Sequence, residues 1–171
     1  PWRRAADPIG EDDAKALLGG MASVDLHSHA GRILRFSDTT SFADVASDMR
    51  SGGMAAICLA VVADSPATHV LPDGRIQAYR EPEPGELYRW SQRAFARVEA
   101  LIDKEDFTAI TRADQLEAAR SARPSVVIAA EGADFLDTSI ERLEEYYTNH
   151  RLRHLQLTHY RVNTLGDIQT E

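Results

Sequence analysis

The sequence predicts an α/β protein built on a parallel sheet. Short apolar runs alternate with amphipathic stretches along most of the 171 residues, in the order β-α-β-loop-α-β-α-β-α-β. Alternation of this kind is typical of parallel strands joined by right-handed helical crossovers. The run at 54–63 is apolar throughout, as expected of a strand buried on both faces of a parallel sheet.

Two architectures fit this alternation, an open doubly wound sheet and a (β/α)8 barrel. No glycine-rich phosphate-binding motif follows the first strand, which argues against a nucleotide-binding doubly wound sheet. A closed barrel needs about 250 residues. If the fold is a barrel, this chain supplies roughly its N-terminal half.

The first elements are a strand at 23–27 and a helix after it. The helix is expected because apolar residues repeat at the spacing of a helix face, at Phe42, Val45, Ala46 and Met49. Ser41 and Asp44 have the spacing of a capping box at its start. The pair Gly52-Gly53 is expected to end it, before the buried strand begins.

The segment 64–85 is predicted to be a long loop. It contains four prolines, and Pro72-Asp73-Gly74 predicts a turn within a small hairpin at 70–79. Loops of this length are usually functional lids or disordered segments. We expect this one to cover the mouth of a site.

The second half continues the alternation with the clearest helix of the chain. That helix is expected at 86–105, where one face is apolar along the whole length. The remaining elements are a short strand at 107–110, a helix opened by Thr111 and Asp114, a strand at 125–131, a helix opened by the capping pair Thr138 and Glu141, and a strand at 151–159.

Composition limits the classes of partner and compartment. The net charge of −8 predicts an acidic surface that repels nucleic acid and anionic membranes. No apolar run approaches the roughly 20 residues of a membrane span. The one cysteine, Cys58, lies in an apolar run and is expected to be a small core residue. No secretory signal is visible, so a cytoplasmic location is expected.

The first strand ends in residues that are able to bind a metal. With a period of two, Asp25, His27 and His29 are expected to share one face. Imidazole nitrogens from positions i and i+2 of a strand converge on one ion, and neutral imidazole is a good zinc ligand. The alternative is a pair of surface histidines. The position favours a metal, because functional residues of barrels lie at the carboxyl ends of the strands.

Two later strands end in comparable residues. Glu131 closes the strand 125–131, and a carboxylate there is costly to bury unless it is paired or binds a metal. His159 closes the last strand as a ligand, a proton-transfer group or an oxyanion donor. Arg161 and Asn163 follow it and are expected to line the same mouth. The alternatives are a helix-capping acid and a hydrogen-bonded histidine, and the other histidines are placed outside the cluster: His69, His150 and His154.

Taken in order, these segments resemble the renal (membrane) dipeptidase family of zinc peptidases, within the amidohydrolase-type barrels. That family opens with an Asp-x-His-x-Asp strand end, matched by Asp25-Leu26-His27-Ser28-His29. A Glu-Gly pair closes a later strand, as at 131–132. A helix, a turn and a strand ending in Leu-Thr-His then follow, as at 157–159, with Asn163 after them. The similarity covers residues 22–168.

The resemblance implies a (β/α)8 barrel with two zinc ions in one site. Residues 1–20 are then an N-terminal extension, and 21–171 are the N-terminal half of the hydrolase barrel. His27 and His29 would bind the first zinc, Glu131 would bridge both ions, and His159 would contact the scissile region of a dipeptide. The peptide bond would be hydrolysed by a hydroxide that bridges the metals. The second zinc would need histidines from later strands, and a homodimer is left open.

One residue departs from the family pattern. The family has Asp where this chain has His29, so the site loses one negative charge. Metal preference and substrate are therefore left open. The alternatives are another binuclear amidohydrolase acting on a cyclic amide, lactone or phosphoester, or a non-catalytic domain that retains the fold.

Overall fold

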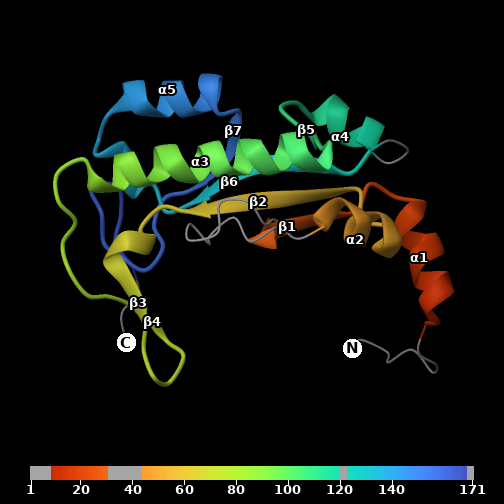
Figure 1. The fold of residues 1–171 in the computed structure, drawn as a ribbon, viewed down its shortest axis with the longest axis horizontal. Helices are drawn as coiled ribbons and strands as arrows, with labels where there is room; N and C mark the ends of the chain where they lie inside the picture. Colours follow the sequence, from red (N-terminus) through yellow and green to blue (C-terminus); the bar gives the residue numbers. More distant parts are fainter. Residues whose placement is uncertain (1–8, 31–43, 120–122, 169–171) are drawn as a thin grey trace, which may run out of the picture.

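The computed structural model describes residues 9–30, 44–119 and 123–168. These residues form an α/β protein with a parallel sheet flanked by helices, as predicted (Figure 1). The sheet strands are β1 Val24–Ser28, β2 Ala56–Val62, β5 Thr108–Ala109, β6 Ser125–Glu131 and β7 Leu152–Gln156.

Strand β6 is the centre of the sheet. On one side it pairs with β2 over its whole length, from Ser125 opposite Ala56 to Glu131 opposite Val62. On the other side its first residues pair with β5 and its last residues with β7. Strand β1 completes the sheet beyond β2. The four longer strands therefore lie side by side in chain order, as an open sheet in the described part of the chain.

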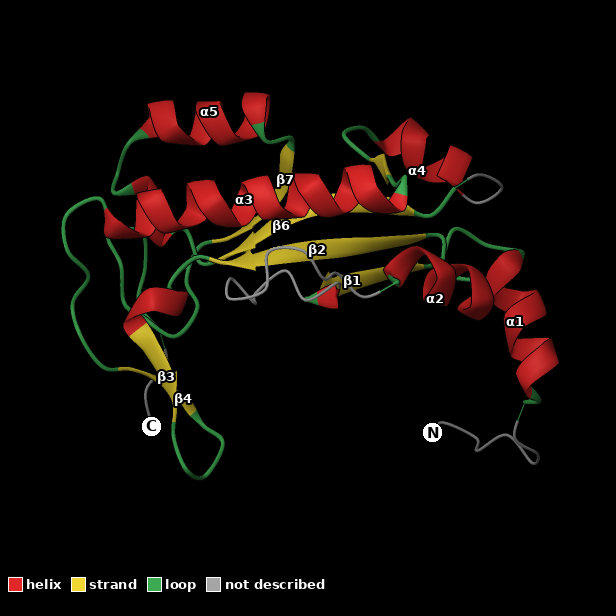
Figure 2. Cartoon of the chain, in the orientation of Figure 1, coloured by secondary structure: helices red, strands yellow, loops and turns green. Residues whose placement is uncertain are grey.

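In the described part of the chain, five α-helices connect or flank these strands (Figure 2). Helix α3 matches its predicted bounds, whereas α1 was not predicted, because it buries no residue and so shows no apolar stripe. The helices are α1 Glu11–Gly19, α2 Val45–Gly52, α3 Glu86–Glu105, α4 Ala113–Ala119 and α5 Ile140–Asn149. No helix among the described residues is long and apolar enough to cross a bilayer.

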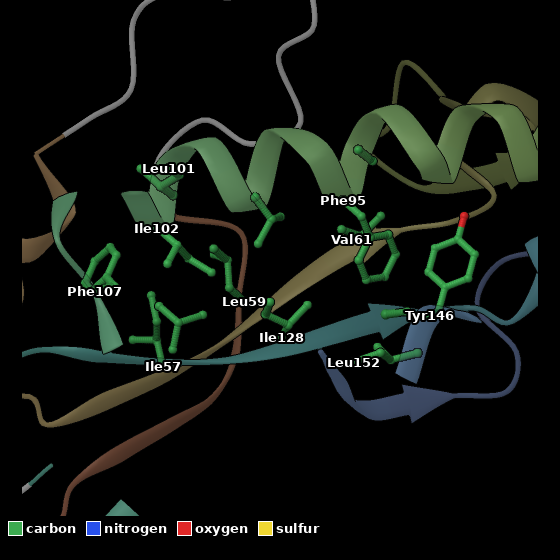
Figure 3. Close-up of a cluster of buried hydrophobic side chains, with 14 of the residues drawn as sticks. Ile57, Leu59, Val61, Phe95, Leu101, Ile102, Phe107, Ile128, Tyr146 and Leu152 are labelled. Atoms are coloured by element: carbon green, nitrogen blue, oxygen red, sulfur yellow. The ribbon is translucent and has the colours of Figure 1, made fainter. Parts of the chain in front are cut away.

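The main core lies between the sheet and three helices. Ile57, Leu59 and Val61 alternate along β2 and point to the face that α2, α3 and α5 cover. Figure 3 shows α3 above this face, with Phe95 close to Tyr146 of α5. Each fully buried large apolar side chain contributes about 1.5–3 kcal/mol of transfer free energy. One shared core under three helices holds the strands in register.

The opposite face of β2 and β6 carries small side chains. Cys58, Ala60 and Ala129 form a separate buried cluster there, which confirms Cys58 as a small core residue. Helix α4 packs against Ala56 near the amino ends of the strands. The carboxyl ends of the strands, where the site was predicted, are left uncovered by this helix.

The predicted hairpin is present, although it is short. It pairs β3 Thr68–Val70 with β4 Ile76–Ala78 in antiparallel register. Gly74 adopts a φ of 85° in the turn, a value that favours glycine. Figure 2 shows this hairpin on the side of the sheet toward which the arrowheads of β2 and β6 point.

Two helix ends test the capping predictions. Asp44 is itself the N-cap of α2 and accepts a hydrogen bond from the Ser47 backbone N–H, whereas the predicted capping box placed Asp44 three residues inside the helix. Gly53 ends α2 with a φ of 72°, as predicted. Ser41 and Phe42 lie outside the described residues. The predicted cap of α5 is wrong by one residue, because Ser139, not Thr138, accepts the hydrogen bond from the backbone N–H of the helix. Ser139 has the extended backbone that a cap needs, whereas Thr138 has a φ of 72°.

The last strand ends earlier than predicted. Strand β7 stops at Gln156, three residues before His159, because β6 ends at Glu131 and the next residue, Gly132, turns the chain with a φ of 87°. The Leu157 carbonyl then accepts a hydrogen bond from the Ala133 backbone N–H. His159 is consequently held by a loop and not by the strand.

Candidate metal centre

Strands β1 and β6 bring the candidate ligands together across β2. His27 lies near the end of β1 and His29 directly follows it, while Glu131 is the last residue of β6. Both strands run parallel to β2, so their carboxyl ends meet at one edge of the sheet.

Two imidazole nitrogens converge on one carboxylate. The distance from His27 Nε2 to Glu131 Oε1 is 3.3 Å, and that from His29 Nε2 to Glu131 Oε2 is 3.2 Å. The three donor atoms all lie within 4.8 Å of one another. The Glu131 side chain is only 13% exposed, so its charge is not fully solvated and needs positive partners.

The protonation of His29 and Glu131 is coupled. The hydrogen bond to Glu131 raises the pKa of His29 above its ordinary value of 6.5, although partial burial of the ring lowers it. Burial raises the pKa of Glu131, but the hydrogen bond from His29 and the charges of His159 and His27 together bring it below its ordinary 4.5. At neutral pH Glu131 is a carboxylate.

A backbone carbonyl orients the His29 ring. His29 Nδ1 lies 2.9 Å from the Ala60 carbonyl oxygen, which only accepts, so Nδ1 carries a proton. The other ring nitrogen, Nε2, therefore faces Glu131. A carbonyl that holds Nδ1–H in this way is the usual support of a histidine that binds a metal through Nε2.

Asp25 does not join this cluster. The pairing of β1 with β2 shifts by one residue between Asp25 and Ser28, so the alternation with a period of two does not hold along β1. The expectation that Asp25, His27 and His29 share one face by simple alternation is therefore wrong. The Asp25 carboxylate accepts a hydrogen bond from the His27 backbone N–H at 3.1 Å and braces the end of the strand.

His159 reaches the cluster from the loop after β7. Its Nε2 lies 3.3 Å from Glu131 Oε1, and its Nδ1 lies 2.8 Å from Asp64 Oδ1. Gly132 makes this approach possible, because a Cβ at that position would lie 3.4 Å from the His159 Cβ and 2.9 Å from Asp134 Oδ2. Three imidazoles thus surround one carboxylate.

Sequence reasoning missed Asp64 as a functional residue. It was assigned to the start of the polar loop, yet its side chain is fully buried. The available signal was its position, directly after a strand buried on both faces. An acid at the end of such a strand needs a partner for its charge.

Arg161 and Asn163 form a different group. Arg161 is buried and pairs with Asp134 at 2.9 Å and with Glu81 at 2.7 Å. Asn163 donates to Asp134 at 3.2 Å. These residues line a pocket of about 360 Å³, separate from the one beside Glu131. The structure does not bring them to the metal cluster, and their substrate-binding role stays a prediction.

A pocket of about 400 Å³ opens beside the cluster. The β3–β4 hairpin forms part of its wall, with His69 stacked on Tyr79 at 5.0 Å between ring centroids. His69 is exposed and also lines this pocket. His29, Glu131, His159, Tyr160, Val70 and Ile76 also line this pocket.

The remaining histidines lie away from the cluster. His150 ends α5 in the turn before β7, as predicted, and its Nδ1 lies 3.1 Å from a Glu99 carboxylate oxygen. His154 is exposed on β7 opposite Ala129. The register shift within the β6–β7 pair places His154 on the sheet face that carries the small residues.

Comparison with known proteins adds no relative: no protein-family model matches the chain, and no curated protein matches its sequence.

Proposed function

We propose that this chain carries the first half of a binuclear zinc site in a (β/α)8 barrel and belongs to a zinc-dependent dipeptidase. The observation that supports it most is the cluster of His27, His29 and Glu131 at the carboxyl ends of parallel strands. Functional residues of α/β barrels come from this end of the strands. The chain order of the four longer strands, with three helices over one face, agrees with a segment of such a barrel.

The donor set fits zinc. Two imidazole nitrogens and a carboxylate are ligands that catalytic zinc sites use, as in sites with two histidines and one glutamate. His29 already has the Nδ1–H support that such a ligand requires. When bound, zinc would polarise a carbonyl group and lower the pKa of water to about 7.

Glu131, His159 and the β3–β4 hairpin have different roles in the proposed site. Glu131 turns Oε1 toward His27 and Oε2 toward His29, so both of its oxygens face the cluster, as a residue shared by two metal ions would need. His159 turns Nε2 toward the same carboxylate, where it would hold the carbonyl oxygen of the scissile bond. The hairpin, with Val70 and Ile76 in the pocket wall, would limit the substrate to the size of a dipeptide.

The second zinc needs further ligands. Two of the described histidines lie away from the cluster: His150 pairs with Glu99, and His154 is exposed on β7. His159 lies beside Glu131 but is assigned to the substrate. By the resemblance, later strands of the barrel provide two more histidines. The chain of 171 residues should then bind one zinc tightly, and turnover should require the natural protein in which both metal sites are complete.

Metal analysis of the purified chain tests this proposal. We expect one zinc per chain, and Glu131→Gln should abolish binding because it replaces a charged ligand by a neutral amide. Glu99→Gln is the matched control, since it alters a histidine–glutamate pair outside the cluster. Zinc retained at full stoichiometry in Glu131→Gln would contradict the bridging role.

An activity assay separates the dipeptidase from its alternatives. The natural protein should hydrolyse dipeptides, including one with a D-residue at its carboxyl end, and Glu131→Gln should lose metal and activity together. Hydrolysis of a cyclic amide, lactone or phosphoester alone would indicate another amidohydrolase. Absence of both zinc and hydrolysis would indicate a non-catalytic domain.

A further inference from the structure

The pocket beside the metal cluster is lined by two unlike sets of residues. The sheet edge and the loop after β7 supply His29, Glu131 and His159, which the proposed function uses for metal and substrate. The β3–β4 hairpin supplies Val70 and Ile76, which that function uses only as a limit on size. The pocket volume of about 400 Å³ is at the small end of the range usual for ligand sites, so a molecule bound at the cluster would also meet the hairpin.

Val70 and Ile76 form an apolar pair on the hairpin. They lie directly opposite each other in the antiparallel register of β3 and β4, so their side chains share one face of the ribbon. Val70 is 68% exposed and Ile76 is 36% exposed. A ligand that covers them removes apolar surface from water, which is favourable. Their place in the wall of this pocket indicates that the ligand of the metal cluster is what covers them.

A third apolar residue lies next to the Glu131 carboxylate. Val62 ends β2 opposite Glu131 in the parallel register, so the two side chains share one face of the sheet. Val62 also lines the pocket. Behind it on this face are the small buried residues Ala60 and Ala129. Apolar side chains therefore line the pocket both beside the carboxylate and on the hairpin.

The hairpin is held at its base. The Tyr79 backbone N–H donates to the Ala67 carbonyl at 3.0 Å and continues the pairing beyond β3 and β4. Arg80 donates through two nitrogens to the Glu86 carboxylate at the start of α3, and also to the Pro66 carbonyl at 2.8 Å. These contacts attach the hairpin to α3, so the apolar pair is positioned before a ligand binds, which lowers the cost of binding.

We propose that Val62, Val70 and Ile76 form a subsite for an apolar side chain, so that the site selects dipeptides with an aliphatic residue beside the scissile bond. The kinetic part of this inference rests on the proposed hydrolase. The binding part does not, since it concerns only the pocket and a side chain that fits it.

Two polar residues of the hairpin that line the same pocket have partners within the protein. The Thr68 hydroxyl donates to the Ser65 carbonyl at 3.4 Å, and the His69 ring stacks on Tyr79. A polar substrate side chain placed against the valines and Ile76 would lose its hydrogen bonds to water without replacing them, which is unfavourable.

A pair of dipeptides, Leu-Leu and Asn-Asn, tests the binding part. Leucine and asparagine side chains have nearly the same shape and neither is charged, so the two dipeptides differ in polarity alone. Each is titrated into the 171-residue chain in the presence of a chelator, and the methyl ¹³C–¹H signals of Val70 and Ile76 are followed. We expect Leu-Leu to shift these signals at a concentration at least about 10-fold lower than Asn-Asn, because even a single methylene in an apolar pocket is worth about 10- to 200-fold.

A double substitution, Val70→Thr with Ile76→Thr, should remove this preference. Threonine keeps the branched shape that suits a strand and adds a hydroxyl. Both positions are partly or largely exposed, so the fold should be retained. Gln77→Thr is the matched control, because Gln77 lies on the other face of the hairpin and outside the pocket lining. It should leave the preference for Leu-Leu unchanged.

Three results would overturn the inference. The first is the absence of methyl shifts with Leu-Leu up to the limit of its solubility. The second is equal or tighter binding of Asn-Asn, which would show a polar subsite. The third is an unchanged preference in the double variant.

Kinetics of the natural protein complete the test. The ratio of kcat/KM for Leu-Leu to that for Asn-Asn should be at least about 10, and the double variant should lower this ratio toward 1 while it retains zinc. A zinc-dependent dipeptidase without this ratio would overturn the kinetic part alone. If neither dipeptide is hydrolysed, the proposed function fails, while the methyl shifts still decide whether the apolar subsite exists.

Discussion

His29 is the residue at which this chain departs from the dipeptidase pattern, and its surroundings explain how an imidazole is accommodated. Its ring is held between the Ala60 carbonyl and Glu131, and its edge meets the His27 ring with centroids 4.9 Å apart. An aspartate would not reach the Ala60 carbonyl in the same way. The orientation of this ligand therefore depends on a contact that the family residue would not make.

We predict that His29→Ala lowers zinc affinity by at least about 100-fold, because loss of an outer-shell support alone costs about 10- to 100-fold. His29→Asp should retain zinc, since a carboxylate is also a zinc ligand. Competition titration with a chromogenic chelator measures both affinities. Equal affinities of the native chain and His29→Ala would exclude His29 from the site.

The coupled protonation of His29 and Glu131 predicts the pH dependence of stability in the metal-free chain. The raised pKa of His29 gives a contribution that is complete below 6.5 and is lost as pH rises through the raised value. The lowered pKa of Glu131 gives a contribution that is complete above 4.5 and is lost as pH falls through the lowered value. The pair therefore stabilises most between these two pH values.

Urea unfolding in the presence of a chelator tests this pH window. The difference in unfolding free energy between the native chain and Glu131→Gln should be largest between pH 4.5 and 6.5, the ordinary pKa values of the two groups. It should shrink on either side of that window. A difference that stays constant from well below pH 4.5 to well above pH 6.5 would show that the two groups are not coupled.

At the scale of single elements, the start of α5 shows that backbone conformation, and not residue type and spacing alone, determines which residue caps a helix. Both Thr138 and Ser139 are residue types that cap helices, and each has an acid two or three positions later. Ser139 caps because its backbone is extended, and its hydroxyl also donates to Glu141. Thr138 lies in the left-handed region, where a β-branched residue is unfavourable.

Substitutions at these two neighbours have distinct expected effects. Ser139→Ala should lower the unfolding free energy by about 1 kcal/mol, because the first turn of α5 loses its acceptor. Thr138→Ala should change it by less than about 0.5 kcal/mol, as is usual for surface positions. Chemical denaturation of both variants provides the comparison. A larger loss of unfolding free energy in Thr138→Ala than in Ser139→Ala would show that Thr138 is the cap, as the sequence spacing predicted.

For the whole molecule, the proposed zinc ion would join segments that are distant in sequence. His27 and Glu131 belong to strands that do not pair with each other, so a shared ion would link β1 to β6 across β2. Binding to the folded state alone raises the unfolding free energy by about 2.7 kcal/mol at a ligand concentration 100 times the Kd. For a chain of this size, about 1 kcal/mol shifts the melting temperature by about 2–4 °C.

We therefore expect zinc to raise the melting temperature of the chain by about 5–10 °C at that saturation. Differential scanning calorimetry with and without zinc measures the shift. Glu131→Gln should show little of it, while Glu99→Gln, outside the cluster, should show all of it. An equal shift in both variants would mean that zinc binds elsewhere.

Much of the fold could be predicted from local patterns of apolar residues. Helix α3 and strand β6 have their predicted bounds, because a long apolar stripe and a run of buried branched residues each identify one conformation. Boundaries set by tertiary contacts were harder to predict. Strand β7 stops at Gln156 because its partner strand ends, and nothing in the sequence 151–159 marks that point.

What the sequence determined by itself is the residue types and their places at strand ends: His27 and His29 after an apolar strand, and Glu131 closing another. Parallel strands end at one edge, so the sequence was enough to predict that these residues meet. Tertiary structure alone decided how they meet. The register shift in β1 turns Asp25 away from the cluster, and the turn at Gly132 lets His159 approach Glu131. The buried Asp64 pairs with His159. These outcomes depend on contacts between segments far apart in the chain, which no local pattern encodes.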